Sequence, residues 1–437
     1  MTKDDRLLKA ARTAINHIAG ELRADLVVTL WNGETIPLGP NARGDLGFVI
    51  RTPVAITRLL RGRRLTTLVE LMAAGDIDIV GGTLLDVAAR RGEIGSKGLV
   101  KRLNKWLLLR SLLPFLFAST KEAPPPAADH AYQGDQAARD EQGRDNKALV
   151  QFHYDLSNAF YGLFLDPEMQ YSCAYFPRWD AGIEEAQIAK LDMICRKLRL
   201  KPGEKFLDIG CGWGGLVCHA ARNYGVEAHG VTLSQAQYDF VQEKIARLGL
   251  QGKVHVELKD YRAVEGTFDK IASIGMFEHV GLDNQTAYFT KMRELLRPRG
   301  LLLNHAITRP AKKTEEAFRK KRPEYAAIVN YIFPGSELDH IGHSVSAIER
   351  HGFEIHDVEG WREHYARTTK LWCERLYANR DKAIAEVGEA KTRLWLLYLA
   401  GVSLGFERGT IGIFQTLGSR RAKGLSGLPP TRADLYR

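Results

Sequence analysis

The residues most suited to chemistry in this chain are glycines placed directly after an apolar run. The segment Phe206–Gly215 begins with apolar residues, carries an acid at Asp208, and has glycine at alternate positions from Gly210 to Gly214. Glycine lacks the Cβ atom that would keep a ligand away from the backbone, and the acid can bind a polar group of that ligand. The spacing differs from the dinucleotide pattern G-x-G-x-x-G. We expect a nucleotide-like cofactor here, and a simple packing turn is the alternative.

Strands and helices alternate after this turn. The predicted strands cover residues 226–231, 254–258, 268–274 and 300–305. This alternation predicts a parallel, doubly wound α/β sheet, in which ligands bind outside the carboxyl ends of the strands. Polar residues at those ends should therefore lie along one edge of the sheet, namely Asp208, Thr232, Asp260, Glu278 and His305.

The first part of the chain predicts a small α+β domain. Apolar residues recur at helical spacing from Leu7 to Leu22, and a strand at 25–31 runs into an Asn32–Gly33 hairpin turn. Two further strands are expected at 48–51 and 77–80. No combination of catalytic side chains is evident in this region.

A change of composition separates this region from the rest. Residues 119–147 contain three prolines at 124–126, followed by a run of polar residues and alanine, which predicts a flexible linker or mobile loop. We therefore expect an N-terminal domain at 1–118 and a catalytic domain at 148–437.

The chain is basic, with a formal net charge of +10 and a pI of about 9.2. Such a balance favours an anionic partner, either nucleic acid or a membrane surface. A predicted basic helix contains Arg58, Arg61, Arg63 and Arg64. This helix presents either a solvated face or a patch that binds anionic lipid.

The cysteines suggest neither a disulfide framework nor a metal site. They are five in number and lack paired Cys-x-x-Cys spacing: Cys173, Cys195, Cys211, Cys218 and Cys373. The polar N-terminus does not resemble a signal peptide. We expect a cytoplasmic protein.

Two apolar runs are poor candidates for membrane spans. The run 106–117 is shorter than the ~20 residues that a span needs, and it contains Arg110 and Pro114. The run 394–414 is interrupted by Glu407 and Arg408, which favours a buried or surface helix.

Several separated motifs resemble those of one family, the cyclopropane fatty acid synthases, with the related mycolic acid cyclopropane synthases and fatty acid methyltransferases. The resemblance covers nearly the whole chain. The matching segments are 153–157, 171–175, 207–215, 231–234, 275–281, 331–334 and 364–368. It implies a class I S-adenosylmethionine (SAM) methyltransferase fold, which is Rossmann-like, with an N-terminal domain that handles lipid and helps dimerisation.

The resemblance implies a role for each cofactor residue. Gly210 and Gly212 would contact the methionine part of SAM, and Asp208 would bind one of its polar groups. The other expected contacts are Tyr171 and Ser172 closing over the cofactor, Thr232, Ser234 and Gln237 at the ribose, and Asp260 and Tyr261 at the adenine.

The resemblance also implies a bound bicarbonate ion beside the substrate. The matching positions are Cys173, Glu278, His305, Ile307 and Tyr365. An alkene that attacks the SAM methyl group becomes a carbocation, and a small fixed anion can then remove a proton so that a cyclopropane ring closes. The expected substrate is an unsaturated acyl chain of a membrane phospholipid.

Three other functions stay open at this stage. The same cation could give a methyl-branched or methylene chain, or the chain could be an amine N-methyltransferase. A noncatalytic SAM-binding or lipid-binding module, or a nucleic-acid protein, is the third, but no basic motif interleaved with aromatic residues supports nucleic-acid binding. We expect a homodimer that associates electrostatically with the inner face of the membrane.

Overall fold

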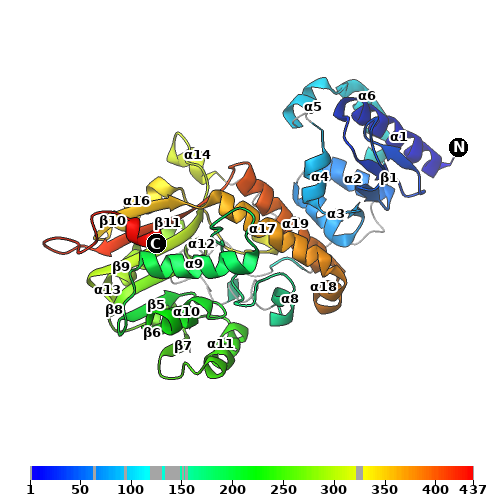
Figure 1. Ribbon diagram of the computed structural model, residues 1–437. Coiled ribbons are helices and arrows are strands. Elements are labelled where there is room, and N and C mark those ends of the chain that lie inside the picture. Colours follow the sequence, from blue (N-terminus) through cyan, green and yellow to red (C-terminus); the bar gives the residue numbers. More distant parts are fainter. Residues whose placement is uncertain are drawn as a thin grey trace. The chain divides into compact units, whose positions relative to one another are not determined.

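The structure is a computed structural model that describes residues 2–62, 65–92, 96–118, 130–132, 148–149, 152, 156–320 and 328–436. The chain forms two compact units (Figure 1). The first comprises Met1–Ala131 with Lys321–Tyr331 and Leu376–Gly401, and the second comprises Tyr132–Lys320, Ile332–Arg375 and Val402–Arg437. No described helix is long and apolar enough to cross a membrane.

A four-stranded sheet with the order β2-β1-β3-β4 forms the centre of the first unit. Its strands are β1 (Val27–Thr29), β2 (Thr35–Pro37), β3 (Gly47–Ile50) and β4 (Ile77–Val80). The helices are α1 (Lys3–Leu22), α2 (Pro53–Gly62), α3 (Leu65–Ala74), α4 (Leu84–Arg90), α5 (Ser96–Arg102) and α6 (Lys105–Leu116). The antiparallel pairing of β1 with β2 confirms the predicted hairpin, and the mixture of elements confirms the small α+β region.

Local sequence explains where these helices begin. Thr2 caps α1 and Thr83 caps α4, and in each case the acid three residues later bonds back to the backbone of the threonine. Such capping boxes satisfy N–H groups that a helix leaves without partners at its start.

Residues from late in the chain complete the first unit. They include α18 (Arg380–Val387) and the part of α19 (Glu389–Glu407) that ends at Gly401. Arg393 of α19 pairs with Asp78 at 3.2 Å, and Tyr331 donates a hydrogen bond to Glu70 at 3.0 Å. Because Leu376–Gly401 belongs to the first unit, a single boundary along the sequence does not separate the two units.

A seven-stranded sheet with the order β10-β11-β9-β8-β5-β6-β7 forms the centre of the second unit. Its strands are β5 (Lys205–Ile209), β6 (Glu227–Thr232), β7 (Val254–Leu258), β8 (Phe268–Ile274), β9 (Leu296–Thr308), β10 (Phe353–Gly360) and β11 (Gly412–Arg420). The five strands from β5 to β9 pair in parallel, which confirms the predicted α/β fold.

The last two strands were not predicted from the sequence. Strand β11 pairs antiparallel with both β9 and β10. The prediction of a helix through residue 414 is therefore wrong at its end, because α19 stops at Glu407 and the chain enters β11 at Gly412. Gly409 has a φ of +67° in the turn that separates them, a conformation that glycine adopts readily.

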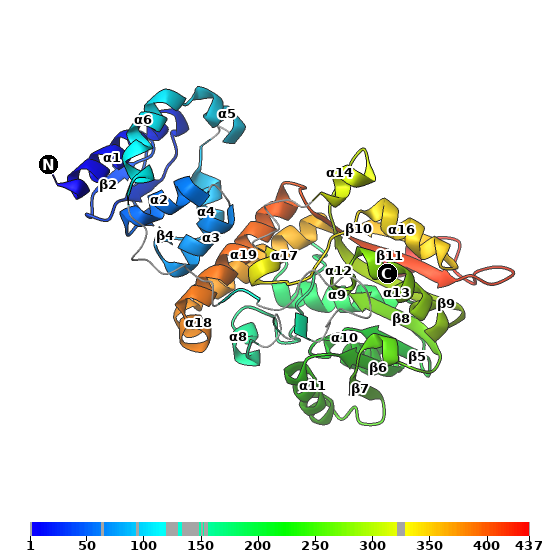
Figure 2. The ribbon, with the colours of Figure 1, turned by 180° about the vertical axis from the view of Figure 1, so that it is seen from behind.

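Helices cover both faces of this sheet (Figures 1 and 2). One face packs against α9 (Ile183–Lys197), α10 (Gly215–Tyr224) and α11 (Gln235–Leu248). The other packs against α12 (Phe277–Val280), α13 (Gln285–Leu295) and α16 (Ile341–Arg350). The remaining elements are α8 (Asn158–Gly162), α14 (Glu315–Arg319), α17 (Arg362–Ala378), η2 (Tyr261–Ala263), η3 (Leu282–Asn284) and η4 (Ala433–Tyr436).

We predict that Gly215→Ala destabilises the second unit by about 1–3 kcal/mol, because overpacking forces neighbouring groups apart. A Cβ atom at Gly215 would lie 1.9 Å from the Gln170 side-chain nitrogen and 3.0 Å from the Glu168 carbonyl oxygen. Denaturant unfolding followed by circular dichroism measures the loss. Gly162→Ala is the control, since no atom lies within 4 Å of its Cβ position. Equal stability of the two variants would contradict the close approach.

Candidate active site

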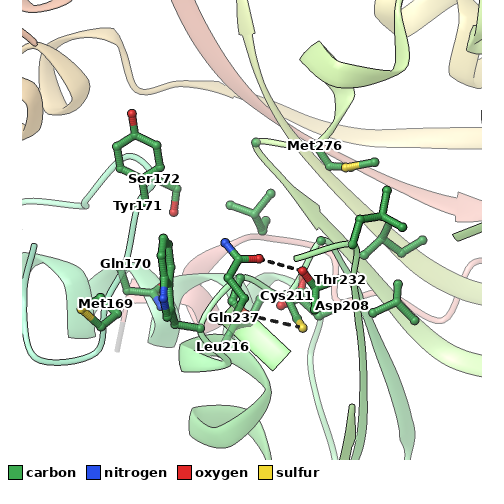
Figure 3. Close-up of a pocket in the computed structure, with 18 of the residues that line it drawn as sticks. Met169, Gln170, Tyr171, Ser172, Asp208, Cys211, Leu216, Thr232, Gln237 and Met276 are labelled. Atoms are coloured by element: carbon green, nitrogen blue, oxygen red, sulfur yellow. Dashed lines mark hydrogen bonds between the residues drawn. The ribbon is translucent and has the colours of Figure 1, made fainter. Parts of the chain in front are cut away.

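A pocket opens at the carboxyl ends of β5, β6 and β8 (Figure 3). Eight of the ten predicted cofactor residues line it: Tyr171, Ser172, Asp208, Gly210, Gly212, Thr232, Gln237 and Tyr261. Figure 3 shows Tyr171 and Ser172 on one side of the pocket and Met276 on the other. The strand ends therefore converge as the parallel sheet requires.

The glycine turn brings backbone to this pocket. Gly210 and Gly212 have backbone φ values of +76° and +53°, which residues other than glycine rarely adopt. The N–H groups of Gly210 and Cys211 both donate to the Val231 carbonyl oxygen at 3.0 Å, which ties the turn to the end of β6. No atom lies within 4 Å of a Cβ position at Gly212, so a ligand can approach the backbone there.

Residues after β6 present an amide to the pocket. The Thr232 hydroxyl donates to Gln237 Oε1 at 2.7 Å, and Figure 3 shows the amide nitrogen of Gln237 on the side away from Thr232. An amide nitrogen in this position can donate hydrogen bonds to hydroxyl oxygens such as those of a ribose. The chain therefore has a hydroxyl group and an amide group at the end of β6, and no acidic residue directly after this strand.

Two predicted cofactor residues do not line the pocket. Ser234 is buried and caps α11, where its hydroxyl accepts the Gln237 N–H at 3.4 Å. Asp260 caps the η2 turn and pairs with Arg262 at 2.8 Å. Both residues position pocket neighbours, namely Gln237 and Tyr261.

A buried lysine lies beside the pocket and was missed from the sequence. Lys190 of α9 lines the pocket, and its ammonium donates to Ser172 Oγ at 2.9 Å and to Gln170 Oε1. The signal was available, because Lys190 falls between apolar positions on the face of α9 that the core buries. A lysine on such a face requires polar partners.

Asp208 and Lys190 influence each other's ionisation. Burial raises the pKa of Asp208 to about 7, and the Lys190 charge opposes this rise. Burial lowers the pKa of Lys190 to about 8, against the attraction of Asp166, Cys173 and Asp208. The Oδ1 atom of Asp208 has no hydrogen-bond partner among the described residues, so it can accept one from a ligand.

Aromatic side chains adjoin the same pocket. Tyr171 packs against Tyr161 at 5.5 Å and against Trp372 at 5.2 Å between ring centroids. Trp213 also lines the pocket, although it was not among the predicted cofactor contacts, and it donates through Nε1 to Asn158 at 2.7 Å. These rings hold the pocket wall in place. Of the motif at 153–157, residues 153–155 lie outside the described part of the chain, and Ser157 caps α8.

The residues that were predicted to bind bicarbonate include three at the carboxyl ends of β8 and β9, namely Glu278, His305 and Ile307. The Ile307 N–H donates to Glu278 Oε1 at 2.6 Å. The His305 carbonyl oxygen accepts the N–H of Gly275, a pocket residue, at 2.8 Å. His279, the neighbour of Glu278, also lines the pocket, so the two sets adjoin.

Trp361 links the remaining members of this set. Its ring meets that of His305 edge-on at 5.1 Å. Its carbonyl oxygen accepts the Tyr365 N–H at 3.0 Å and lies 3.8 Å from the Cys173 sulfur. The Cys173 thiol donates to the Ala174 carbonyl oxygen. Burial raises the pKa of the Cys173 thiol well above its usual value, so the thiol stays protonated.

Several buried polar atoms in this region have no hydrogen-bond partner among the described residues. They include Glu278 Oε2, His305 Nε2, Trp361 Nε1 and Gln415 Oε1. The side-chain nitrogen of Gln415 lies 3.1 Å from His305 Nδ1. Because an amide nitrogen only donates, a neutral His305 then carries its proton on Nε2.

The charges around these atoms favour a small anion. Burial lowers the pKa of His305 well below its usual value, and Lys190 and Lys197 lower it further. Burial also raises the pKa of Glu278 to about 7. Two N–H donors, a nearby positive potential and one carboxyl group fit an oxyanion that itself carries a hydroxyl group, as bicarbonate does.

Comparison with known proteins identifies the family of this chain. The model of the mycolic acid cyclopropane synthetase family matches residues 141–416. The Pseudomonas putida protein named probable fatty acid methyltransferase is 37% identical over 419 residues, which cover 95% of this chain and 97% of that protein. Cyclopropane mycolic acid synthase 1 of Mycobacterium tuberculosis is 39% identical over 273 residues, or 61% of this chain and 95% of that protein.

A solved structure matches a large part of this chain. Mycolic acid cyclopropane synthase CmaA1, complexed with SAH and CTAB, aligns with a TM-score of 0.60 and 37% identity. The alignment covers 64% of this chain and all of that one. The chain therefore belongs to the mycolic acid cyclopropane synthetase family and has the fold of class I SAM-dependent methyltransferases, with an additional N-terminal region.

Proposed function

We propose that this protein transfers a methyl group from SAM to the double bond of an unsaturated fatty acyl chain. The observation that carries the proposal is the set of unpartnered atoms on Glu278, His305 and Trp361, directly behind a pocket suited to SAM. A methyltransferase that acts on oxygen or nitrogen needs no such buried anion site. The name of the P. putida relative and the SAH in the CmaA1 complex are consistent with this activity.

The pocket residues bind and orient the cofactor, which supplies the methyl group. Gly212 lets the cofactor approach the backbone, and Asp208 offers a carboxylate oxygen to a cationic or hydroxyl group. Gln237 would donate its amide hydrogens to the ribose, and Tyr261 would flank the adenine ring, since both residues line the pocket. The aromatic wall around Tyr171 limits the access of water to the methyl group.

The second set acts on the proton that the methylated chain must lose. His305 and Trp361 would hold bicarbonate through their N–H groups, with Cys173, Ile307 and Tyr365 around it. Bound there, bicarbonate would supply a small base close to the cation. Glu278, whose pKa is about 7, would accept a hydrogen bond from the hydroxyl group of bicarbonate and would then take up the proton. A weak base suffices because a carbocation is very acidic.

The position of proton loss determines the product. Loss from the new methyl group closes a cyclopropane ring, while a hydride shift and proton loss elsewhere gives a methyl-branched alkene or a methylene chain. The fatty acid methyltransferase reading has the support of the relative that matches almost the whole chain. Cyclopropane formation is the second candidate, favoured by the 39% identity to cyclopropane mycolic acid synthase 1 and by the buried anion site.

Product analysis tests the function and distinguishes the two candidates. We predict that purified protein incubated with SAM and oleoyl phospholipid vesicles adds the mass of one CH₂ group to the acyl chain. Proton NMR then separates cyclopropane protons from methyl-branched or methylene signals. Methylation of an added amine without any change of the acyl chain would overturn the proposal in favour of an N-methyltransferase. Release of no product at all would favour a binding module.

Membrane association and dimerisation belong to the same proposal. A phospholipid acyl chain as substrate, together with the net charge of +10, is consistent with a cytoplasmic homodimer that binds the inner membrane face reversibly.

We predict that Lys190→Met lowers the affinity for SAH about tenfold, measured by titration calorimetry. The variant removes the donor that holds Ser172 and Gln170, and it leaves Asp208 buried without its neighbouring positive charge. Lys270→Met is the matched control. Lys270 is also buried, but it lies at the other end of β8 and pairs with Glu204 at 3.7 Å. Equal losses of affinity in both variants would show a general destabilisation and contradict a role at the pocket.

We predict that Glu278→Gln lowers turnover about 100-fold while it stabilises the fold at high pH. The folded pKa of about 7 lies above the unfolded value of 4.5, so the wild type loses stability as pH rises between these values. The glutamine variant, which still accepts the Ile307 N–H, should be more stable by up to about 3 kcal/mol at pH 8 and equal near pH 4.5.

Unfolding curves between pH 4.5 and 8 measure this difference. Glu257→Gln on β7 is the control, because Glu257 is exposed and far from the site along the sheet order. An offset between Glu278→Gln and wild type that stays constant with pH would show that Glu278 does not titrate on unfolding. Unchanged turnover would remove its role in proton transfer.

A further inference from the structure

Helix α6 of the first unit is apolar on two opposite faces. One face packs into the core of its unit, where Phe115 is fully buried and Leu112 is partly buried. The ring of Phe115 meets Trp31 edge-on at 6.4 Å. A helix that buries one apolar face normally has a polar face on the other side. The opposite face of α6 departs from this rule.

That opposite face carries large exposed side chains at helical spacing. Trp106 is 71% exposed, Leu109 54%, Leu113 45%, and Phe117, just after the last turn, 79%. Solvent exposure of so many adjacent apolar groups is unfavourable, and such a patch marks an interaction surface. We call this set of four side chains the α6 patch.

Both ends of the helix are anchored to the first unit. Asn104 caps the start through its side chain, and its own N–H donates to His17 at 2.8 Å. Arg61 of α2 donates to the carbonyl oxygens of Leu116 at 2.7 Å and Ala118 at 2.9 Å. Arg61 belongs to the basic helix that we expected to present either a solvated face or a patch for anionic lipid, and it instead binds the end of α6. The side chains of the α6 patch are therefore exposed on a helix that is fixed at both ends.

The charges in the segment that carries the patch have one sign. The segment 96–118 contains the basic residues Lys97, Lys101, Arg102, Lys105 and Arg110, and it contains no acid. Four of them, Lys101, Arg102, Lys105 and Arg110, are exposed. Basic residues beside exposed tryptophan, leucine and phenylalanine are the composition of helices that lie in the headgroup region of anionic membranes.

We propose that the α6 patch docks the protein on a bilayer that contains anionic phospholipid. The helix would lie in the plane of the interface, because its twelve residues span about 18 Å and a bilayer core is about 30 Å thick. A second copy of the chain is a poorer occupant. A symmetric dimer places the same patch on both sides, which would bring the like charges of two segments together.

The docking itself depends only on the chemistry of this helix. Its use, which is to hold the enzyme where unsaturated acyl chains are present, rests on the proposed function. Two separate measurements therefore distinguish failure of the docking surface from failure of the methyl transfer.

The test uses the full-length protein and vesicles of saturated phosphatidylglycerol and phosphatidylcholine, which contain no acyl double bond. We expect the triple variant Trp106→Ser, Leu109→Ser, Phe117→Ser to bind at least tenfold more weakly in co-sedimentation. The double variant Trp179→Ser, Leu425→Ser removes exposed apolar side chains from the second unit and should bind within twofold of wild type. Arg110→Gln should weaken binding less and reduce its dependence on salt.

Thermal unfolding checks that the triple variant still folds, since Leu112 and Phe115 are retained. Methyl transfer to a detergent-dispersed acyl substrate should equal that of wild type, while transfer to vesicles falls. Wild-type vesicle binding by a folded triple variant would overturn the docking proposal and leave the proposed function intact. A change of sedimentation coefficient with unchanged vesicle binding would overturn it in favour of a contact between copies. Absence of methyl transfer by the wild type, with the vesicle result as expected, would overturn only the proposed function.

Discussion

The burial of ionisable side chains at one edge of a parallel sheet is the constraint on which the rest of the structure depends. Asp208 lies near the end of β5, Glu278 follows β8, His305 lies on β9, and Lys190 on α9 lines the same pocket as Asp208. Each would be more stable in water, and the fold compensates only in part, because several polar atoms keep no partner among the described residues. The same incomplete pairing gives Asp208 and Glu278 pKa values near neutrality and leaves donors and acceptors for ligands.

Local patterns were sufficient to predict the parallel half of the sheet and the glycine turn. Apolar runs, turn residues and helical spacing all act over a few positions, so β5 to β9 and the β1–β2 hairpin could be predicted. Strands β10 and β11 could not, because β11 is stabilised by pairing with β9, more than one hundred residues earlier. The return of Leu376–Gly401 to the first unit is likewise a property of packing and leaves no periodic signal.

Some residues of the candidate site could likewise be predicted from local patterns, and others could not. Residues at strand ends, such as Asp208 and Thr232, follow from topology, and the pocket contains them. The roles of Ser234 and Asp260 as caps depend on whether a side chain turns toward its own backbone or toward the ligand, which the residue type does not determine. Trp361 was missed because its importance comes from contacts with His305 and Cys173, which are distant in sequence. Lys190 was detectable as a charge on a buried helical face.

The position of β11 in the sheet has a consequence for biosynthesis. It is the last strand of the chain, yet it lies between β9 and β10 and brings Gln415 to His305. Until the ribosome has released this segment, β9 has an open edge and His305 has no neighbour to set the position of its proton. The oxyanion-binding side of the site is therefore completed only at the end of synthesis. The glycine turn between β5 and α10 can form much earlier, so a nascent chain can contain the cofactor loop well before it can control a proton.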